Sequence, residues 1–458
     1  MKDIYLTGYS VRGIKNIDEL VTLSFYKKVI EKDPDMQEYN IKGIYGMNGS
    51  GKSGIIMSVE ILKNLICDSG YLNNPITQKK LDAIVNKRTQ ELFMQADYLA
   101  KAGEYLSYFR YEITLSQDMS GKYVISHEQL LYRNAISKKE EMESIFEISN
   151  GEIVSLYEKE KNSEASEIIF QKTINLLSTA TISALFVEKT FNQFYREDHR
   201  KLSFLIWSLV VLCILSGNLH VYLDASDDHS GYVAWNSLEH PENLEKYSTE
   251  IYSLINHLYK IDNGSREMLL ISNNLIRKSG YQSFEKTVDS LFEFLHIFKS
   301  DLQRIEIEKK ENKDFFSCDL IMVYDSYKIH AEFESTGIKK LIKLFSYLKE
   351  MVQGGIVFID ELDSNLHDVY LCALLEYLME YGEGQLCFTT HNVGPMDVLK
   401  QRKKSIDFLS EDHKMYSWKK NGNYSPSKLY RSGMIEGSPF NIDSIDFIGV
   451  FGAGGEDE

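Results

Sequence analysis

The stretch that decides the fold is Gly46-Met47-Asn48-Gly49-Ser50-Gly51-Lys52-Ser53. The mostly apolar run 41–45 precedes it, and in the following residues 53–68 apolar side chains recur at the spacing of a helix. A strand, a glycine-rich turn of the pattern G-x-x-x-x-G-K-S and a helix are together typical of a phosphate-binding loop. A glycine-rich turn without a ligand is the alternative, and the flanking strand and helix favour the phosphate site.

Each residue type in this loop has a chemical reason. Glycines let the backbone turn its N–H groups inward, and the helix that follows points its positive pole at the same place. Lys52 would reach the outer phosphates, and the Ser53 hydroxyl would occupy one position on a Mg²⁺ ion. The predicted phosphate-binding residues are therefore Gly46, Asn48, Gly49, Ser50, Gly51, Lys52 and Ser53.

The composition is that of a globular protein with more than one domain. The chain has 458 residues, more than a single core usually holds, and its hydrophobic fraction of 43% excludes a largely disordered chain. A formal net charge of −16 argues against a protein covered by nucleic acid, although a local basic groove stays open. Five scattered cysteines without a C-x-x-C pair, and no signal-peptide region, favour the cytoplasm.

An uncharged segment, residues 202–223, could by its length cross a membrane. Serine, glycine, asparagine and histidine interrupt it, and its densest apolar part, residues 202–215, has the length of a buried core helix. We therefore predict a buried helix followed by a strand over residues 219–223, with a membrane span as the alternative.

Strand-like and helix-like patterns alternate along the rest of the chain. Residues 4–11, 21–29, 104–116 and 123–132 predict strands, and Asn150-Gly151 predicts a hairpin, so an antiparallel layer is expected in the first part. A polar helical stretch is predicted over residues 78–99, and residues 163–300 have a mainly helical pattern. Strands are expected again at residues 304–308, 316–324 and 328–333.

The second decisive stretch, residues 355–361, has four consecutive apolar residues that end in Asp360 and Glu361. Continuous hydrophobicity is what a central parallel strand, buried on both faces, requires, and ligands bind at the carboxyl ends of such strands. Asp360 would hold Mg²⁺ through water, and Glu361 would polarise a water molecule for attack on the γ-phosphate. A strand that ends in a solvated acidic pair is the alternative.

A similar buried-strand pattern, residues 385–392, ends in His391. At the top of a neighbouring strand, this histidine could contact the γ-phosphate and the water near Glu361. A lone histidine is more often structural, but the order and spacing after the acidic pair favour a role as a sensor of the phosphate.

Together, the phosphate loop, the late Asp-Glu pair and the strand-end histidine resemble the motif order of ABC-type ATPases, including the SMC, RecF and OLD-like groups. The resemblance implies ATP and Mg²⁺ as cofactors and a Ser-x-Gly at a helix start, which Ser335 and Gly337 supply. In the family this helix start binds the ATP held by a second copy, and Asp363 resembles the residue that crosses that interface. Arg12 is also predicted to bind the nucleotide. A metal-shell glutamine is not identified, with Gln95 as a guess.

The closest resemblance is to stand-alone OLD-like ATPases of two-gene phage-defence systems, of the AbiL, PARIS and Septu kinds. It implies an ATPase head, in which a parallel or mixed sheet joins an antiparallel layer, with an inserted mainly helical domain. The domains expected are an N-terminal lobe over 1–162, the insertion over 163–303 and a C-terminal lobe over 304–458. The stretch after His391 is too short for a TOPRIM nuclease domain, and Leu366-His367 and the acidic tail 456–458 also resemble this group.

The resemblance implies slow, assembly-dependent ATP hydrolysis, homodimers or higher homo-oligomers through the ATP sites, and a separately encoded TOPRIM- or HNH-like nuclease as partner. A phage protein or DNA is the expected trigger, and no membrane is expected. A RecF-like DNA clamp is the alternative function, and a transporter ATPase is a third. Residues 224–229 are predicted to be a solvated acidic loop. The basic patch open to DNA consists of Lys400, Arg402, Lys403, Lys404, Lys419 and Lys420.

Overall fold

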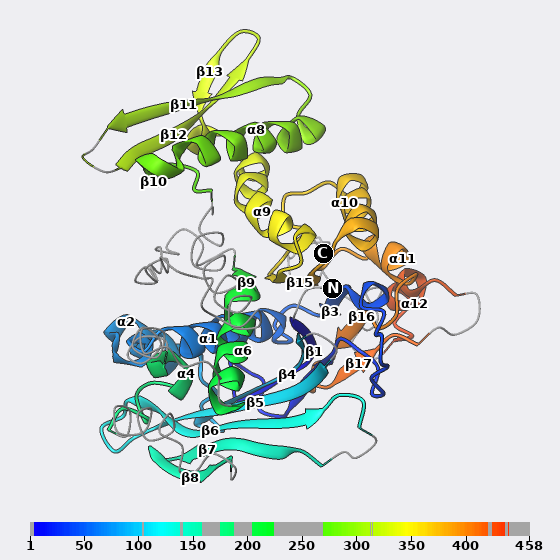
Figure 1. Cartoon of the computed structure of the whole chain (residues 1–458). Coiled ribbons are helices and arrows are strands. Elements are labelled where there is room, and N and C mark those ends of the chain that lie inside the picture. The colour runs from blue at the N-terminus through cyan, green and yellow to red at the C-terminus, as the bar shows by residue number, and fades with distance from the viewer. Residues whose placement is uncertain are drawn as a thin grey trace, which may run out of the picture.

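The computed structural model describes residues 4–102, 105–137, 141–157, 175–186, 204–223, 269–311, 313, 315–419, 424–435 and 438. These residues form a mixed α/β structure with three sheets (Figure 1). The predictions for residues 224–229, for Lys420 and for the acidic tail lie outside the described residues.

A six-stranded sheet carries the two decisive stretches, and its strand order is β17-β16-β3-β15-β14-β9. All of its neighbours pair in parallel except the edge strand β17. Every residue of β3, β14 and β15 is buried, as the continuous apolar runs predict for central parallel strands. The strands are β3 (Ile41–Gly46), β9 (Leu219–Tyr222), β14 (Ile356–Ile359), β15 (Gln385–Thr389), β16 (Ile406–Leu409) and β17 (Met415–Ser417).

Helices cover both faces of this parallel sheet. One face packs on α1 (Lys52–Cys67) and α6 (Phe204–Asn218), and the same core extends across these helices to the antiparallel sheet. Figure 1 shows α1 and α6 between the two sheets. Short α4 (Ile182–Leu185) packs beside them. The other face packs on α9 (Thr336–Val352), α10 (Asp368–Tyr381), α11 (Pro395–Leu399) and α12 (Pro426–Arg431).

The uncharged segment forms a buried helix and a strand. Helix α6 is apolar on all sides, which suits a helix enclosed by protein, and β9 follows it directly as the edge of the parallel sheet. The prediction of a buried helix followed by a strand is therefore confirmed. None of the helices in the described part of the chain combines the length and hydrophobicity needed to cross a bilayer.

The predicted antiparallel layer is a seven-stranded sheet of order β2-β1-β4-β5-β6-β7-β8, and Asn150-Gly151 makes the tight turn between its last two strands. Next to it lies the helix α2 (Pro75–Ile84). The strands are β1 (Ile4–Arg12), β2 (Val21–Ser24), β4 (Glu91–Ala102), β5 (Tyr105–Gln117), β6 (Tyr123–Asn134), β7 (Glu143–Ser149) and β8 (Glu152–Leu156).

The helix predicted for residues 78–99 is wrong in its second half. Helix α2 ends at Ile84, and residues 91–99 belong to β4, which lies between β1 and β5. Leu92, Met94 and Tyr98 are fully buried at a period of two, so packing in the sheet overrides the polar composition of this stretch.

A third, smaller sheet lies at the far end of the molecule from the antiparallel layer (Figure 1). Its order is β10-β12-β11, with β13 also paired to β12, and α8 (Tyr281–Phe298) covers it. The first half of α9 packs into this core, whereas the second half packs against the parallel sheet. The strands are β10 (Asn274–Arg277), β11 (Leu302–Glu311), β12 (Phe315–Tyr324) and β13 (Lys328–His330).

A separate helical domain over residues 163–303 is not confirmed. The described parts of this range include α4, α6 and α8, but also β9 in the parallel sheet and β10 in the small sheet. The described parts of this range therefore belong to hydrophobic cores that also contain residues from the segments before and after it.

The buried Glu128 on β6 should make stability depend on pH. Its carboxyl group accepts hydrogen bonds from the Tyr111 hydroxyl (2.9 Å) and the Ile182 N–H (3.2 Å), and burial raises its pKa to about 7. Because the folded protein prefers the protonated form, this stabilisation is present at low pH and is lost as the pH rises through about 7. Glu128→Gln stays neutral, so its free energy of unfolding relative to wild type should rise by about 2 kcal/mol between pH 5 and pH 8.

Urea denaturation at the two pH values measures this difference. The exposed Glu152 on β8 provides a matched control, and Glu152→Gln should show no such change. Equal pH dependence of Glu128→Gln and wild type would contradict the prediction.

Candidate functional site

The phosphate loop leaves the carboxyl end of β3 and enters α1, as the sequence predicts. Gly49 (φ 81°) and Gly51 (φ 109°) have left-handed backbone conformations that suit glycine. A Cβ on Gly51 would also lie 2.7 Å from the Ile17 side chain. The buried Lys52 side chain folds back over the loop, and its Nζ donates to the carbonyl oxygens of Gly46 (2.8 Å) and Met47 (2.9 Å).

The acidic pair lies at the carboxyl end of β14, on the same edge of the sheet. Thr389, from the neighbouring β15, donates a hydrogen bond to Asp360 Oδ1 (2.6 Å) and accepts one from the Glu361 N–H (2.8 Å). Glu361 itself has φ 51°, a conformation that is uncommon for a residue with a side chain. The turn after β14 is therefore held in a defined, strained shape.

Strand β15 lies between β3 and β14, so it places His391 between the phosphate loop and the acidic pair. The exposed His391 donates its backbone N–H to Asp363 Oδ2 (3.4 Å). The half-buried Asp363 thus lies next to His391 within one copy of the chain. Its predicted role across an interface remains a prediction.

Charges from three segments meet at this edge. Burial lowers the pKa of Lys52 to about 8, and the carboxylates of Asp360, Glu361 and Asp363 oppose that shift. Partial desolvation of the imidazole ring and the Lys52 charge together lower the pKa of His391, and the same three carboxylates oppose that shift. The imidazole is therefore neutral at pH 7, with one nitrogen able to donate and the other able to accept a hydrogen bond.

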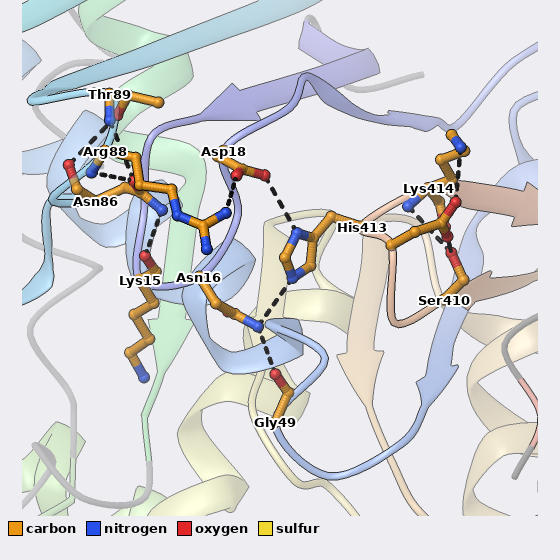
Figure 2. Close-up of polar contacts among 11 residues, drawn as sticks. Lys15, Asn16, Asp18, Gly49, Asn86, Arg88, Thr89, Ser410, His413 and Lys414 are labelled. Carbon is orange, nitrogen blue, oxygen red and sulfur yellow. Dashed lines mark hydrogen bonds and ion pairs between the residues drawn. The ribbon is translucent and has the colours of Figure 1, made fainter.

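A polar network braces the phosphate loop from outside (Figure 2). The Asn16 side chain donates to the Gly49 carbonyl (2.5 Å) and lies 3.0 Å from His413 Nε2. His413, in the turn between β16 and β17, reaches Asp18 with its other ring nitrogen (3.4 Å), and Arg88 also pairs with Asp18 (3.1 Å). The loop after β1 and the β16–β17 turn thus fix the outer side of the phosphate loop.

Ser335 caps α9, and the family resemblance implies that the start of this helix binds the ATP of a second copy. Its hydroxyl accepts from the Ile338 N–H (3.3 Å), and both Ser335 and Thr336 are exposed. A Cβ on Gly337 would lie 2.9 Å from the Asn365 carbonyl oxygen, so glycine allows this helix start to approach the loop after Glu361. No hydrogen bond or ion pair joins residues 335–337 to residues 46–53, all of which are described.

Other predicted residues lie elsewhere. Arg12, at the end of β1, pairs with Glu91 (3.6 Å), and the Gln95 side chain donates to Asp97 Oδ2 (3.1 Å). Their roles in binding nucleotide or metal stay predictions. His367 caps α10 by accepting from the Val369 N–H (3.4 Å).

Sequence reasoning missed several residues that shape the site. Thr389 stands inside the strand pattern that pointed to His391, so a hydroxyl beside a buried carboxylate was available as a signal. Asn16 and His413 are far apart in the sequence and belong to no motif. Only the fold brings them together.

The residues present fit a nucleotide with Mg²⁺. Ser50 Oγ and Asp363 Oδ1 are buried without a hydrogen-bond partner, which is costly unless a ligand or water satisfies them. The described residues contain no group of three or more metal-ligating side chains. Mg²⁺ in a phosphate site needs none, because one or two protein oxygens, phosphates and waters complete its shell. Ser53 and Asp360 are the residues that would hold it.

The phosphate loop, the acidic strand end and the intervening strand lie at one edge of the parallel sheet, an arrangement that fits a P-loop fold. Residues 222–397 match the family model described as "AAA domain, putative AbiEii toxin, Type IV TA system". This range is therefore similar to an ATPase domain, and it contains Ser335, Asp360, Glu361 and His391. Among curated proteins, none matches the chain.

The lowered pKa of Lys52 predicts that nucleotide binding weakens at high pH. Bound phosphates favour the charged ammonium, so above pH 8 the lysine must first take up a proton. The dissociation constant for a fluorescent ADP analogue should rise about tenfold from pH 7 to pH 9. In Lys52→Arg, which stays charged at pH 9, the dissociation constant should be independent of pH, even if the affinity is lower. A pH-independent dissociation constant for wild type would contradict this assignment.

Proposed function

We propose that this chain is an ATP-hydrolysing subunit that assembles through ATP sandwiched between two copies and controls a separately encoded nuclease in antiviral defence. The observation that carries the ATPase part is the meeting of Lys52, Glu361 and His391 at one edge of the parallel sheet. Three segments of the chain supply these residues, so their proximity is a property of the fold.

The proposed chemistry follows from these side chains. Lys52 stabilises negative charge on the outer phosphates, and bound Mg²⁺, held by Ser53 and Asp360, would neutralise more of it. Glu361 orients the attacking water and accepts its proton. Neutral His391 donates a hydrogen bond toward the γ-phosphate.

The exposed start of α9 supports the second-copy part of the proposal. In one copy, residues 335–337 do not bond to the phosphate loop, and Ser335 and Thr336 remain exposed. A helix start with exposed N–H groups suits an anion brought by another molecule. The complete site then needs two copies, which makes hydrolysis slow in the isolated subunit.

The defence role rests on similarity. The matched family model names a toxin of a Type IV TA system, and the motif order resembles OLD-like ATPases of phage-defence systems. We therefore propose a TOPRIM- or HNH-like nuclease as the partner, and a phage protein or DNA as the trigger.

The DNA-clamp alternative has less support, because the basic patch is engaged within this chain. Most of its side chains already bind groups nearby: Lys400 pairs with Asp397, Arg402 donates to Met379, Lys403 pairs with Glu38, and Lys404 donates to Ser24 and Tyr26. Steeply salt-dependent DNA affinity that is lost on neutralising these residues would instead favour the clamp.

Substitutions at Glu361 and Lys52 test whether ATP drives assembly. Glu361→Gln should lower kcat about a hundredfold because it removes the proton acceptor, and should accumulate ATP-bound dimers or larger assemblies. Lys52→Ala should form none, because it lacks the phosphate contact. Light scattering after gel filtration, with and without ATP, measures both. Equal oligomer populations with and without ATP in both variants would contradict the proposal.

A mixture of two inactive variants tests whether each ATP site is built from residues of two copies of the chain. Ser335→Asp keeps a capping oxygen for α9 but repels phosphate, so this variant and Lys52→Ala should each lack ATPase activity. Mixed together, they form one intact site per dimer, from the Lys52 of one copy and the Ser335 of the other. ATPase activity should then recover to a fraction of the wild-type rate. No recovery, in a mixture shown to form heterodimers, would contradict the sandwich.

A further inference from the structure

We infer that Lys340 is a positioning residue that fixes the backbone of the turn at Glu361, after β14, and links this turn to the start of α9. The inference rests on the proposed function, because it assigns a role in ATP hydrolysis to a residue that no sequence motif singled out. Lys340 lies on α9, five residues after Ser335, and its side chain is buried (4% exposed).

The Lys340 ammonium binds the turn that follows β14. Its Nζ donates to the Glu361 carbonyl oxygen (2.5 Å) and to the Ser364 hydroxyl. It also lies 5.8 Å from the centre of the Tyr222 ring. A buried ammonium is costly unless such groups compensate it, so its position and that of the turn constrain each other.

Both backbone polar groups of Glu361, its N–H and its carbonyl oxygen, are therefore bound by side chains. Thr389 accepts its N–H (2.8 Å), and Lys340 binds its carbonyl oxygen (2.5 Å). These two bonds span the residue with φ 51°, and a left-handed conformation persists only where its surroundings enforce it. Since the backbone sets the direction of the side chain, Lys340 determines where the Glu361 carboxylate points.

The same helix links this turn to two other parts of the molecule. Its start carries Ser335 and Gly337, and Gly337 abuts Asn365 in the loop after Glu361. Its first half, on either side of Lys340, packs into the core of the small sheet through Ile338 and Leu341. A displacement of α9, whether from a second copy at its start or from the small sheet, therefore moves the Lys340 ammonium and the Glu361 turn with it.

The test separates positioning from binding and folding. Lys340→Met keeps the length and apolar stem of the side chain but removes the donor. We expect its kcat to fall at least tenfold, while its dissociation constant for an ATP analogue stays within twofold of wild type. Lys340→Arg, which restores a charged donor, should recover a large part of kcat. The matched control is Lys339→Met, since Lys339 is its neighbour on the helix and, among the described residues, hydrogen-bonds only to the Glu332 carbonyl oxygen (3.4 Å).

Ser364→Ala provides a second variant if Lys340→Met does not fold. It removes one of the groups that bind the ammonium, so kcat should fall several-fold with unchanged nucleotide affinity. An unchanged kcat in Lys340→Met would overturn the inference, and if only Ser364→Ala folds, an unchanged kcat in that variant would do so. A loss of nucleotide affinity as large as the loss of kcat would also overturn it. So would a fall of kcat in Lys339→Met as large as that in Lys340→Met. If wild type itself hydrolyses no ATP, the proposed function fails and the inference with it. A hydrolysing wild type beside an unimpaired Lys340→Met contradicts the inference alone.

Discussion

The candidate site depends on one constraint, the parallel pairing of β15 with β3 on one side and β14 on the other. Parallel strands end at the same edge, so this order places the phosphate loop, His391 and the acidic pair next to one another. The Thr389 hydroxyl then joins two strands by bonding both Asp360 and the Glu361 N–H. Without the intervening strand, the lysine and the carboxylates would not share an electrostatic environment.

The balance of charge at this edge depends on burial as much as on pairing. Lys52 is removed from water, and its ammonium is supported by two carbonyl oxygens and the nearby carboxylates. Partial desolvation and that same ammonium lower the pKa of His391. The edge thus brings together the Lys52 ammonium, three carboxylates and the His391 imidazole.

Helix α9 connects this edge to the rest of the molecule. Its two halves belong to different cores, one against the small sheet and one against the parallel sheet. From the half that packs on the small sheet, Lys340 reaches the Glu361 turn. A helix shared by two cores transmits displacement because packed interiors resist compression. The small sheet is therefore well placed to influence the chemistry, although it contributes no residue to the acidic pair or the phosphate loop.

The sequence by itself determined the local parts of this protein. Three features follow from local rules of backbone freedom and burial. They are the glycine pattern before Lys52, the apolar runs before Asp360 and His391, and the buried helix after residue 203. The same rules gave the wrong structure for residues 91–99, because strand pairing with distant segments outweighed a polar composition that suits a helix. The match over residues 222–397 supports an ATPase-type domain there.

Only the tertiary structure decided which of these parts meet. The contact between Asn16 and His413 joins residues that are 397 positions apart, and Asn16 also bonds to Gly49 in the phosphate loop. The Lys340 bond to Glu361 depends on how α9 packs. No local pattern encodes such contacts, because they follow from strand order and from the burial of whole faces. The motifs from which the site residues are predicted are therefore visible in the sequence, whereas the side chains that contact them, such as Asn16 and Lys340, are identified only from the fold.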